Sequence, residues 1–342
     1  MGQNTMRNKN KRIQKIMISN TKVLLDEKAV AKLCAAAGFR DIENVTSMGA
    51  GEFNAVYAFD ADEKGYALKI APDANVPVMT YETNMMQSEV YWYEKLRTHT
   101  DIRVPEIVYT DFSKSLVLSD FFIMERINGR QMNEMNFTPQ ERADATSKLP
   151  QMAAQIHRIR HDGYGYLQNG YHATWDQALA AMTEAIICDA GRMGESCENG
   201  EKVLKLIHKH RAVLAKAPCR MVNFDLWEAN ILCERMGDGS IQYVWIDPER
   251  SYWGDPIMDI ICFEPDRPLM EKKASIGAYN QVAEQPIGIG REEEIRFAFA
   301  QAYLGLIMEV ERYYRYVPGG EGWQRNVFAC QGLFAGAYGG LE

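Results

Sequence analysis

A short polar loop between two apolar runs is the feature that most constrains this chain. Residues 221–232 read Met-Val-Asn-Phe-Asp-Leu-Trp-Glu-Ala-Asn-Ile-Leu, which places Asp225 five residues before Asn230. Because the apolar residues on both sides belong in a core, the two ends of the loop are fixed and its polar side chains are held at set positions. Asp225 and Asn230 are therefore the first candidates for a functional pair.

Two acidic segments follow at a spacing that strengthens this interpretation. The apolar run 243–246 ends in Asp247, seventeen residues after Asn230, and residues 254–259 read Gly-Asp-Pro-Ile-Met-Asp. Alone, Asp225 and Asn230 are better explained as a turn residue and a loop cap. With the two later segments in register, the functional interpretation is favoured.

These residue types suit phosphoryl transfer. That reaction needs a group that positions the attacking hydroxyl and accepts its proton, and oxygen ligands that hold Mg²⁺ against the phosphates. Asp225 suits the first role. Asn230 and Asp247 suit the second, because Mg²⁺ prefers hard oxygen ligands and takes few of them from protein. The sequence contains neither a P-loop motif nor a Gly-x-Ser-x-Gly nucleophile motif.

At these motifs the chain resembles the aminoglycoside phosphotransferase and choline kinase family. The loop pattern of that family is close to His-Gly-Asp-x-x-x-x-Asn, followed by Ile-Asp and by Gly-Asp-Pro-x-x-Asp. Three upstream segments resemble its lysine-bearing strand, its glutamate-bearing helix and the hinge between its lobes: residues 66–70, 88–96 and 122–129. The resemblance covers roughly residues 40–265 and implies an α+β, bilobal, protein-kinase-like fold.

The same resemblance implies a site for ATP or GTP with Mg²⁺. In that family the strand lysine contacts the α- and β-phosphates, and this lysine is Lys69 here. A buried ammonium group needs an acidic partner. Helical phase and the family pattern favour Glu89 for that partner over Glu82 and Glu94.

Two backbone segments complete the implied nucleotide site. The loop 49–54, with Gly49 and Gly51, would cover the phosphates with its N–H groups. The hinge backbone at Glu125 and Ile127 would read the nucleotide base.

The chain departs from the family at the start of the loop, where Asn223 and Phe224 replace His-Gly. The family histidine braces the loop through hydrogen bonds. Asparagine also donates and accepts, but with a shorter reach. The departure raises the alternative of a nucleotide-binding pseudokinase that acts as a scaffold. An active enzyme is favoured because Lys69, Asp225 and both expected metal ligands are retained.

The pattern of elements predicts a small antiparallel sheet followed by a mainly helical region. We expect a basic flexible tail over residues 1–22, which carry six Lys and Arg and no acidic residue, an N-lobe over 23–127 and a C-lobe over 128–342. Expected strands cover residues 42–48, 53–59, 66–70, 106–110 and 121–127. One expected helix is capped by Asp26, and another begins at Thr138-Pro139. Further helices are expected over residues 81–97, 175–190, 200–216, 268–279, 292–315 and 322–334.

The distribution of charge along the chain limits the classes of binding partner that we expect. The net charge of −8 argues against nucleic acid as the main partner. Residues 223–342 carry −9, which suits a cationic acceptor, although a solvated acidic surface explains it equally well. The acceptor expected first is an aminoglycoside-like antibiotic, which would make the protein a resistance enzyme. Fructosamines, suggested by Leu226-Trp227, and choline-like amino alcohols are the alternatives.

Other sequence features indicate a cytoplasmic protein with no membrane partner. No apolar stretch reaches the length of a membrane-spanning helix. The seven cysteines are scattered and form no Cys-x-x-Cys pair, which is typical of a reducing compartment. The sequence does not indicate the oligomeric state.

Several polar residues near these motifs have simpler structural explanations. Asp255 can cap the helix that Pro256 begins, and Asp259 can brace the loop. His157 and His161 are expected to pack rather than to catalyse. An aromatic group near the C-terminus is expected in the core, with the wall of a substrate cleft as the alternative: Tyr313, Tyr314, Tyr316 and Trp323.

Overall fold

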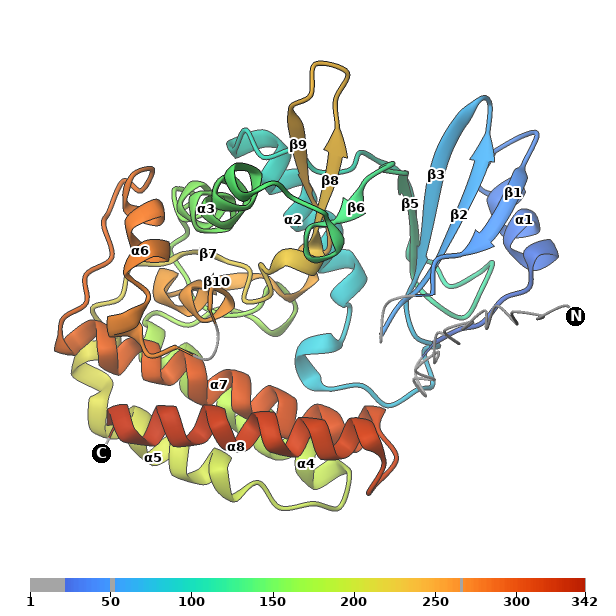
Figure 1. Ribbon diagram of the computed structural model, residues 1–342. Coiled ribbons are helices and arrows are strands. Elements are labelled where there is room, and N and C mark those ends of the chain that lie inside the picture. Colours follow the sequence, from blue (N-terminus) through green and yellow to red (C-terminus); the bar gives the residue numbers. More distant parts are fainter. Residues whose placement is uncertain (1–21, 50–52, 265–266, 342) are drawn as a thin grey trace, which may run out of the picture.

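The computed structural model describes residues 22–49, 53–264 and 267–341. Nearly all of the expected basic tail, residues 1–21, and the expected phosphate-loop residue Gly51 lie outside these ranges. The described chain forms a sheet-containing lobe and a larger, mainly helical lobe (Figure 1). The expected α+β, bilobal fold is confirmed.

The first lobe contains a five-stranded antiparallel sheet in the order β1-β2-β3-β5-β4. Lys69 lies in an inner strand, opposite Val56 on one neighbour and Phe122 on the other. Helix α1 (Glu27–Ala36), capped by the Asp26 side chain, packs Val30, Leu33 and Cys34 against this sheet. The strands are β1 (Glu43–Ser47), β2 (Ala55–Ala61), β3 (Lys64–Ile70), β4 (Ile107–Asp111) and β5 (Phe121–Glu125).

The helix between β3 and β4 starts later than the sequence pattern suggested. Helix α2 covers Met85–His99, and the residues before it form a short 3-10 turn, η1 (Thr80–Glu82). Asn84 has φ of 54°, in the left-handed region, so the backbone cannot continue as an α-helix through it. The expectation of a helix from residue 81 was therefore wrong by four residues.

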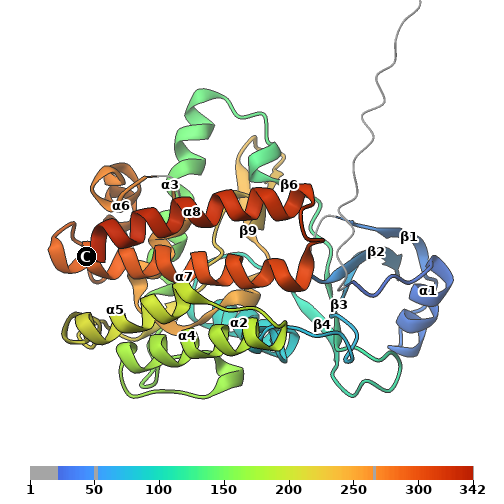
Figure 2. The same ribbon diagram turned by 90° about the horizontal axis from the view of Figure 1, so that it is seen from below.

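The second lobe is built mainly from helices. Figures 1 and 2 show α7 and α8 side by side, with α4 and α5 packed beside them. Pro150 lies inside α3 without ending it. The helices are α3 (Pro139–Ile156), α4 (Trp175–Arg192), α5 (Glu198–Leu214), α6 (Lys273–Asn280), α7 (Arg291–Arg315) and α8 (Glu321–Leu341), with 3-10 turns η2 (Met132–Glu134), η3 (Leu167–Asn169) and η7 (Leu269–Glu271). Two expected bounds were wrong, because α6 starts five residues late and α8 continues seven residues further.

Two small sheets position the loops of interest. One has the order β6-β8-β9 and the other joins β7 to β10, all antiparallel. The strands are β6 (Arg130–Gln131), β7 (Arg220–Val222), β8 (Ile231–Arg235), β9 (Ile241–Trp245) and β10 (Tyr252–Gly254). Loop 223–230, ending in η4 (Glu228–Asn230), connects β7 to β8, and η5 (Pro248–Arg250) connects β9 to β10.

The lobe boundary at residue 127 stays a prediction. Among the described helices, none is both long and apolar enough to cross a bilayer.

Candidate active site

Lys69 lies at the centre of a buried group of carboxylates, which we call the lysine cluster: Lys69, Glu89, Asp247 and Glu249. Its Nζ is 2.8 Å from Glu89 Oε2, 2.5 Å from Asp247 Oδ1 and 2.9 Å from Glu249 Oε2. The expected pairing with Glu89 is present. Burial alone would lower the pKa of Lys69, but the carboxylates, Asp247 first, raise it well above its usual value. The lysine is therefore charged.

Glu249 was missed by the sequence analysis. It lies two residues after Asp247 on the same 3-10 turn, and it accepts a hydrogen bond from Asn54 Nδ2 at 2.6 Å. Burial, with the nearby charge of Asp247, raises the pKa of Glu249 to about 7. The available signal was an Asp-x-Glu spacing at the end of an apolar strand.

The carboxylates of the lysine cluster could hold a metal ion. One oxygen from each of Glu89, Asp247 and Glu249 lies within 4.8 Å of the others. Asp247 has φ of 65°, and its N–H donates to Tyr93 Oη at 2.9 Å, which fixes its side chain at the end of β9. About a third of the Asp247 side chain is exposed, so this carboxylate is accessible to a ligand.

Asp225 and Asn230 come together as the sequence predicted. Asn230 Nδ2 lies 2.9 Å from the Asp225 carbonyl oxygen and 3.3 Å from Asp225 Oδ2. The Asn230 carbonyl accepts the N–H of Ile246 at 2.9 Å, directly beside Asp247. The three residues thus lie in one site with Lys69.

The Asp225 carboxylate is partly exposed and has an unusual environment. Burial raises the pKa of Asp225 to about 6; the nearby Arg250 opposes this shift, and the charge of Asp247 adds to it. Arg250 Nε lies 3.8 Å from Asp225 Oδ2. A carboxylate with a raised pKa is a better proton acceptor when it is ionised.

Two buried side chains brace the loop that carries Asp225. Asn223 Oδ1 accepts the N–H of Asp225 at 3.1 Å, and its Nδ2 donates to Ser251 Oγ at 3.1 Å. Asp259 accepts the N–H of Asn223 at 3.1 Å and that of Phe224 at 2.6 Å. Asparagine therefore braces the loop at the position of the family histidine, and Asp259 acts as the expected brace.

Phe224 occupies the family's glycine position in the left-handed region, with φ of 62°. That conformation is unfavourable for a bulky residue and needs compensation from packing. The ring is buried, with centroids 5.6 Å from Tyr303 and 5.9 Å from Tyr252. Its aromatic contacts hold a loop conformation that glycine would adopt freely.

A second buried charged group lies next to Asp225, and we call it the arginine network: Arg250, Glu311, Arg315 and Glu82, with Tyr81. Arg250 Nη2 is 2.7 Å from Glu311 Oε1, and Arg315 Nη2 is 3.2 Å from the same oxygen. Arg315 also pairs with Glu82, and Tyr81 Oη donates to Glu311 at 2.5 Å. The sequence analysis did not identify this network.

The structure also places the expected hinge residues, together with Gly49 and Asp255. The N–H of Glu125 donates to the Glu106 carbonyl at 2.8 Å, so it is not free for a nucleotide base. Ile127 is buried, and Gly49 has φ of 61°. Asp255 accepts the N–H of Ile257 at 3.1 Å, which confirms its expected capping role.

Comparison with known proteins identifies a family for the chain. Residues 44–265 match the phosphotransferase enzyme family. The sequence matches no curated protein.

Solved structures with the same fold cover nearly the whole chain. A Haemophilus somnus 129PT protein assigned as a fructosamine-3-kinase is 16% identical, with 90% of this chain and 97% of that chain covered and a TM-score of 0.61. A microcompartment-associated aminopropanol kinase is 17% identical, with 92% and 99% covered and a TM-score of 0.60. A thermostable mutant of the aminoglycoside phosphotransferase APH(4)-Ia, solved with AMP-PNP and hygromycin B, is 16% identical, with 91% and 99% covered and a TM-score of 0.59. The family match spans most of the chain, and the chain belongs to the phosphotransferase enzyme family.

Proposed function

We propose that the chain is a Mg²⁺-dependent kinase that moves the γ-phosphate of ATP or GTP to a hydroxyl group of a small molecule. The observation that carries the proposal is the lysine cluster, in which Lys69 contacts both Glu89 and Asp247 beside the Asp225–Asn230 pair. This arrangement supplies a phosphate-binding cation, oxygen ligands for a metal and a proton acceptor in one site.

The proposed nucleotide site lies at the first lobe. Lys69 contacts the α- and β-phosphates, and Glu89 holds its ammonium group in place. The backbone at Gly49 covers the phosphates, and the hinge near Glu125 and Ile127 borders the base. The complex of the APH(4)-Ia mutant with AMP-PNP supports the use of a nucleoside triphosphate.

The residues present fit a magnesium ion. Asn230, Asp247 and Glu249 offer amide and carboxylate oxygens, the ligand type that Mg²⁺ prefers. Bound Mg²⁺ would neutralise charge that develops on the transferring phosphoryl group. Lys69 provides positive charge for Asp247 and Glu249.

Asp225 orients the acceptor hydroxyl and accepts its proton, while Asn223 and Asp259 hold the loop that carries it. Positioning and charge stabilisation suffice for this transfer, with no covalent intermediate on the protein. The pseudokinase alternative rested on the loss of a loop brace. The hydrogen bonds of Asn223 to Asp225 within the loop and to Ser251 outside it support an active enzyme instead.

For the acceptor we propose a small hydroxylated amine, with an aminoglycoside-like antibiotic first, in a cytoplasmic enzyme. The named relatives act on, or bind, amine-bearing compounds: fructosamines, aminopropanol and hygromycin B. The indole of Trp227, two residues after Asp225, is exposed and could contact a sugar ring or an amino sugar. A phosphorylation screen over aminoglycosides, fructosamines and amino alcohols with ATP and GTP tests this choice.

The proposed catalytic role is tested with Asp225→Asn. We expect kcat to fall by about 10²- to 10⁴-fold, because proton transfer from the hydroxyl is lost. Nucleotide affinity, measured by calorimetry, should change little. Asp238→Asn is the matched control, since Asp238 lies in the exposed turn between β8 and β9 and accepts hydrogen bonds from Ser240. An equal loss of nucleotide binding and turnover in Asp225→Asn would contradict the role.

A further inference from the structure

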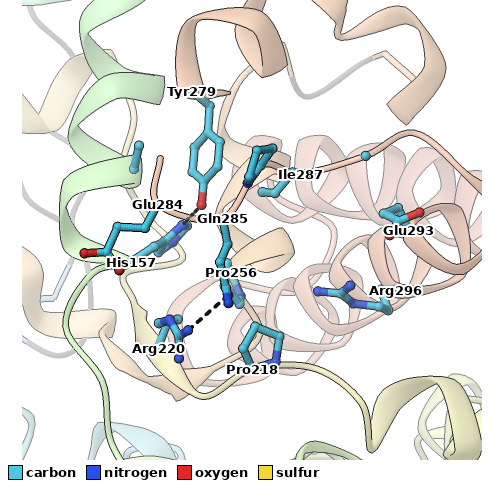
Figure 3. A pocket seen from close by; sticks show the side chains of 13 residues that line it. His157, Pro218, Arg220, Pro256, Tyr279, Glu284, Gln285, Ile287, Glu293 and Arg296 are labelled. Atoms are coloured by element: carbon cyan, nitrogen blue, oxygen red, sulfur yellow. Dashed lines mark hydrogen bonds between the residues drawn. The ribbon is translucent and has the colours of Figure 1, made fainter. Parts of the chain in front are cut away.

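A cavity lies behind the loop that carries Asp225. Its volume is about 240 Å³, and it lies between α3, β7, η6 (Pro256–Cys262) and the start of α7. Its wall includes His157, Arg220, Pro256, Tyr279, Gln285 and Arg296. Figure 3 shows the guanidinium groups of Arg220 and Arg296 on either side of Pro218, with Tyr279 opposite.

We propose that this cavity binds a small carboxylate with an apolar body, and that its occupancy acts on the loop around Asp225 through His157 and Asp259. No step of the proposed kinase reaction uses the cavity. The binding and its effect on the loop can be measured without any phosphoryl acceptor.

The wall carries two arginines and two glutamates, and one of the arginines, Arg220, is placed to receive an anionic ligand. Arg220 donates to the Cys219 carbonyl at 2.8 Å and to Gln285 Oε1 at 3.0 Å. Among the residues that the structure describes, no carboxylate lies within 4.0 Å of this guanidinium. An arginine that is only partly hydrated and has no counter-charge is well suited to a carboxylate, which matches its planar fork.

The other charged groups of the wall are already engaged. Arg296 pairs with Asp255, and Glu284 pairs with Arg160 at 2.9 Å. Glu293 accepts the N–H of Gly290 at 3.1 Å. Arg220 is therefore the group that a ligand would neutralise, and three apolar residues provide contacts for the rest of the molecule: Pro218, Pro256 and Ile287.

Direct contacts join the cavity to the loop. His157 contacts Tyr279 Oη through Nδ1 at 2.8 Å and Asp259 Oδ2 through Nε2 at 3.0 Å. Asp259 in turn accepts the N–H groups of Asn223 and Phe224. Asp255, which caps η6, is the partner of Arg296 in the opposite wall.

The start of η6, at Asp255, and its middle, at Asp259, are thus both linked to the cavity wall. A ligand that contacts Arg220 and displaces His157 or Arg296 shifts the hydrogen bonds that fix the loop. It does so only to the extent that it binds one arrangement of the wall better than another.

The test uses benzoate as the probe, with inorganic phosphate as the comparison, on the full chain. Binding is measured by calorimetry and by the shift in Tm. We expect saturable benzoate binding to the unmodified chain and to Arg291→Gln, and affinity at least about tenfold weaker in Arg220→Gln. Arg291 is the matched control because it is an exposed arginine outside the cavity that pairs with Glu294.

Two further measurements keep the outcome clear. Arg220→Lys keeps the charge without the fork and should bind benzoate with intermediate affinity, which separates loss of binding from loss of folding. Hydrogen exchange at the Asn223 and Phe224 amides should change on addition of benzoate. Equal affinity in Arg220→Gln, absence of saturable binding, or binding of phosphate but not benzoate would overturn the site. Unaltered exchange in the bound chain would overturn its effect on the loop.

Discussion

The lysine cluster and the arginine network are two buried charged groups on either side of Asp225, and they differ in balance. The lysine cluster sets one ammonium group among three carboxylates. The arginine network sets two guanidinium groups against two carboxylates. The first therefore has an excess of negative charge, and the second is formally neutral.

The lysine cluster, which has the excess of charge, is also the more exposed of the two groups. A third of the Asp247 side chain is exposed, whereas Arg315 and Glu82 are 5% and 1% exposed. Excess charge at an accessible site is what a bound cation can neutralise, and a sealed, balanced network has no charge left for a ligand. This difference supports the proposed role of the lysine cluster in phosphoryl transfer, whereas the arginine network joins η1 to α7 beside it.

The largest expected effect comes from unbalancing the sealed network. Arg315→Met leaves Glu82 buried without its cation, and we expect a loss of about 3–5 kcal/mol in the free energy of unfolding. Urea denaturation measures it. Arg291→Met, at an exposed arginine, should be nearly neutral. Adding Glu82→Gln to Arg315→Met should restore part of the loss, and a double variant as unstable as the single one would show that charge balance is not the cause.

Removal of the cation from the lysine cluster should affect activity more than stability. Lys69→Met should lower kcat/KM by about 10²- to 10³-fold, because a positioned phosphate-binding group is lost. Its free energy of unfolding should fall by less than in Arg315→Met, since a third of the Asp247 side chain is exposed to water. Steady-state kinetics and denaturation with and without Mg²⁺ measure the two effects. Lys64→Met, at the exposed start of β3, is the control.

The sequence analysis predicted the lysine cluster far better than the arginine network, for physical reasons. The family resemblance identified Lys69 on its strand, and helical phase together with the same resemblance identified Glu89. Glu311 and Arg315 are four residues apart on α7, which from sequence is also the pattern of an exposed helical ion pair. Only the tertiary packing of η1 against α7 shows that this pair is buried.

Local backbone geometry and contacts between separate segments explain the other differences between prediction and structure. The start of α2 was wrong because Asn84 adopts a left-handed conformation that no periodic pattern reveals. Strand β8 was not separated from the loop before it, since it pairs with β9 across a turn. The hydrogen bonds of Asn223 could not be foreseen, because they depend on Ser251 in a distant segment.

A smaller effect should come from Glu249, which distinguishes a metal-binding cluster from a purely structural one. Glu249→Gln should weaken Mn²⁺ binding in the absence of nucleotide by about 10- to 100-fold, measured by electron paramagnetic resonance. Glu228→Gln is the control, because Glu228 lies in η4 and pairs with Arg142 outside the cluster. Unchanged Mn²⁺ affinity in Glu249→Gln would mean that this carboxylate only holds Lys69 and Asn54.

The smallest expected effect tests how the arginine network shares its charge. Tyr81→Phe removes the hydrogen bond to Glu311 but keeps the ring beside Tyr166, at a centroid distance of 5.6 Å. Glu311 still has two guanidinium partners, so we expect a loss of only about 1–1.5 kcal/mol in the free energy of unfolding. Tyr314→Phe, which removes a bond to the neutral carbonyl of Asp189, should cost less. If Tyr81→Phe destabilised the chain as much as Arg315→Met, the hydroxyl rather than the balance of charges would hold the network together.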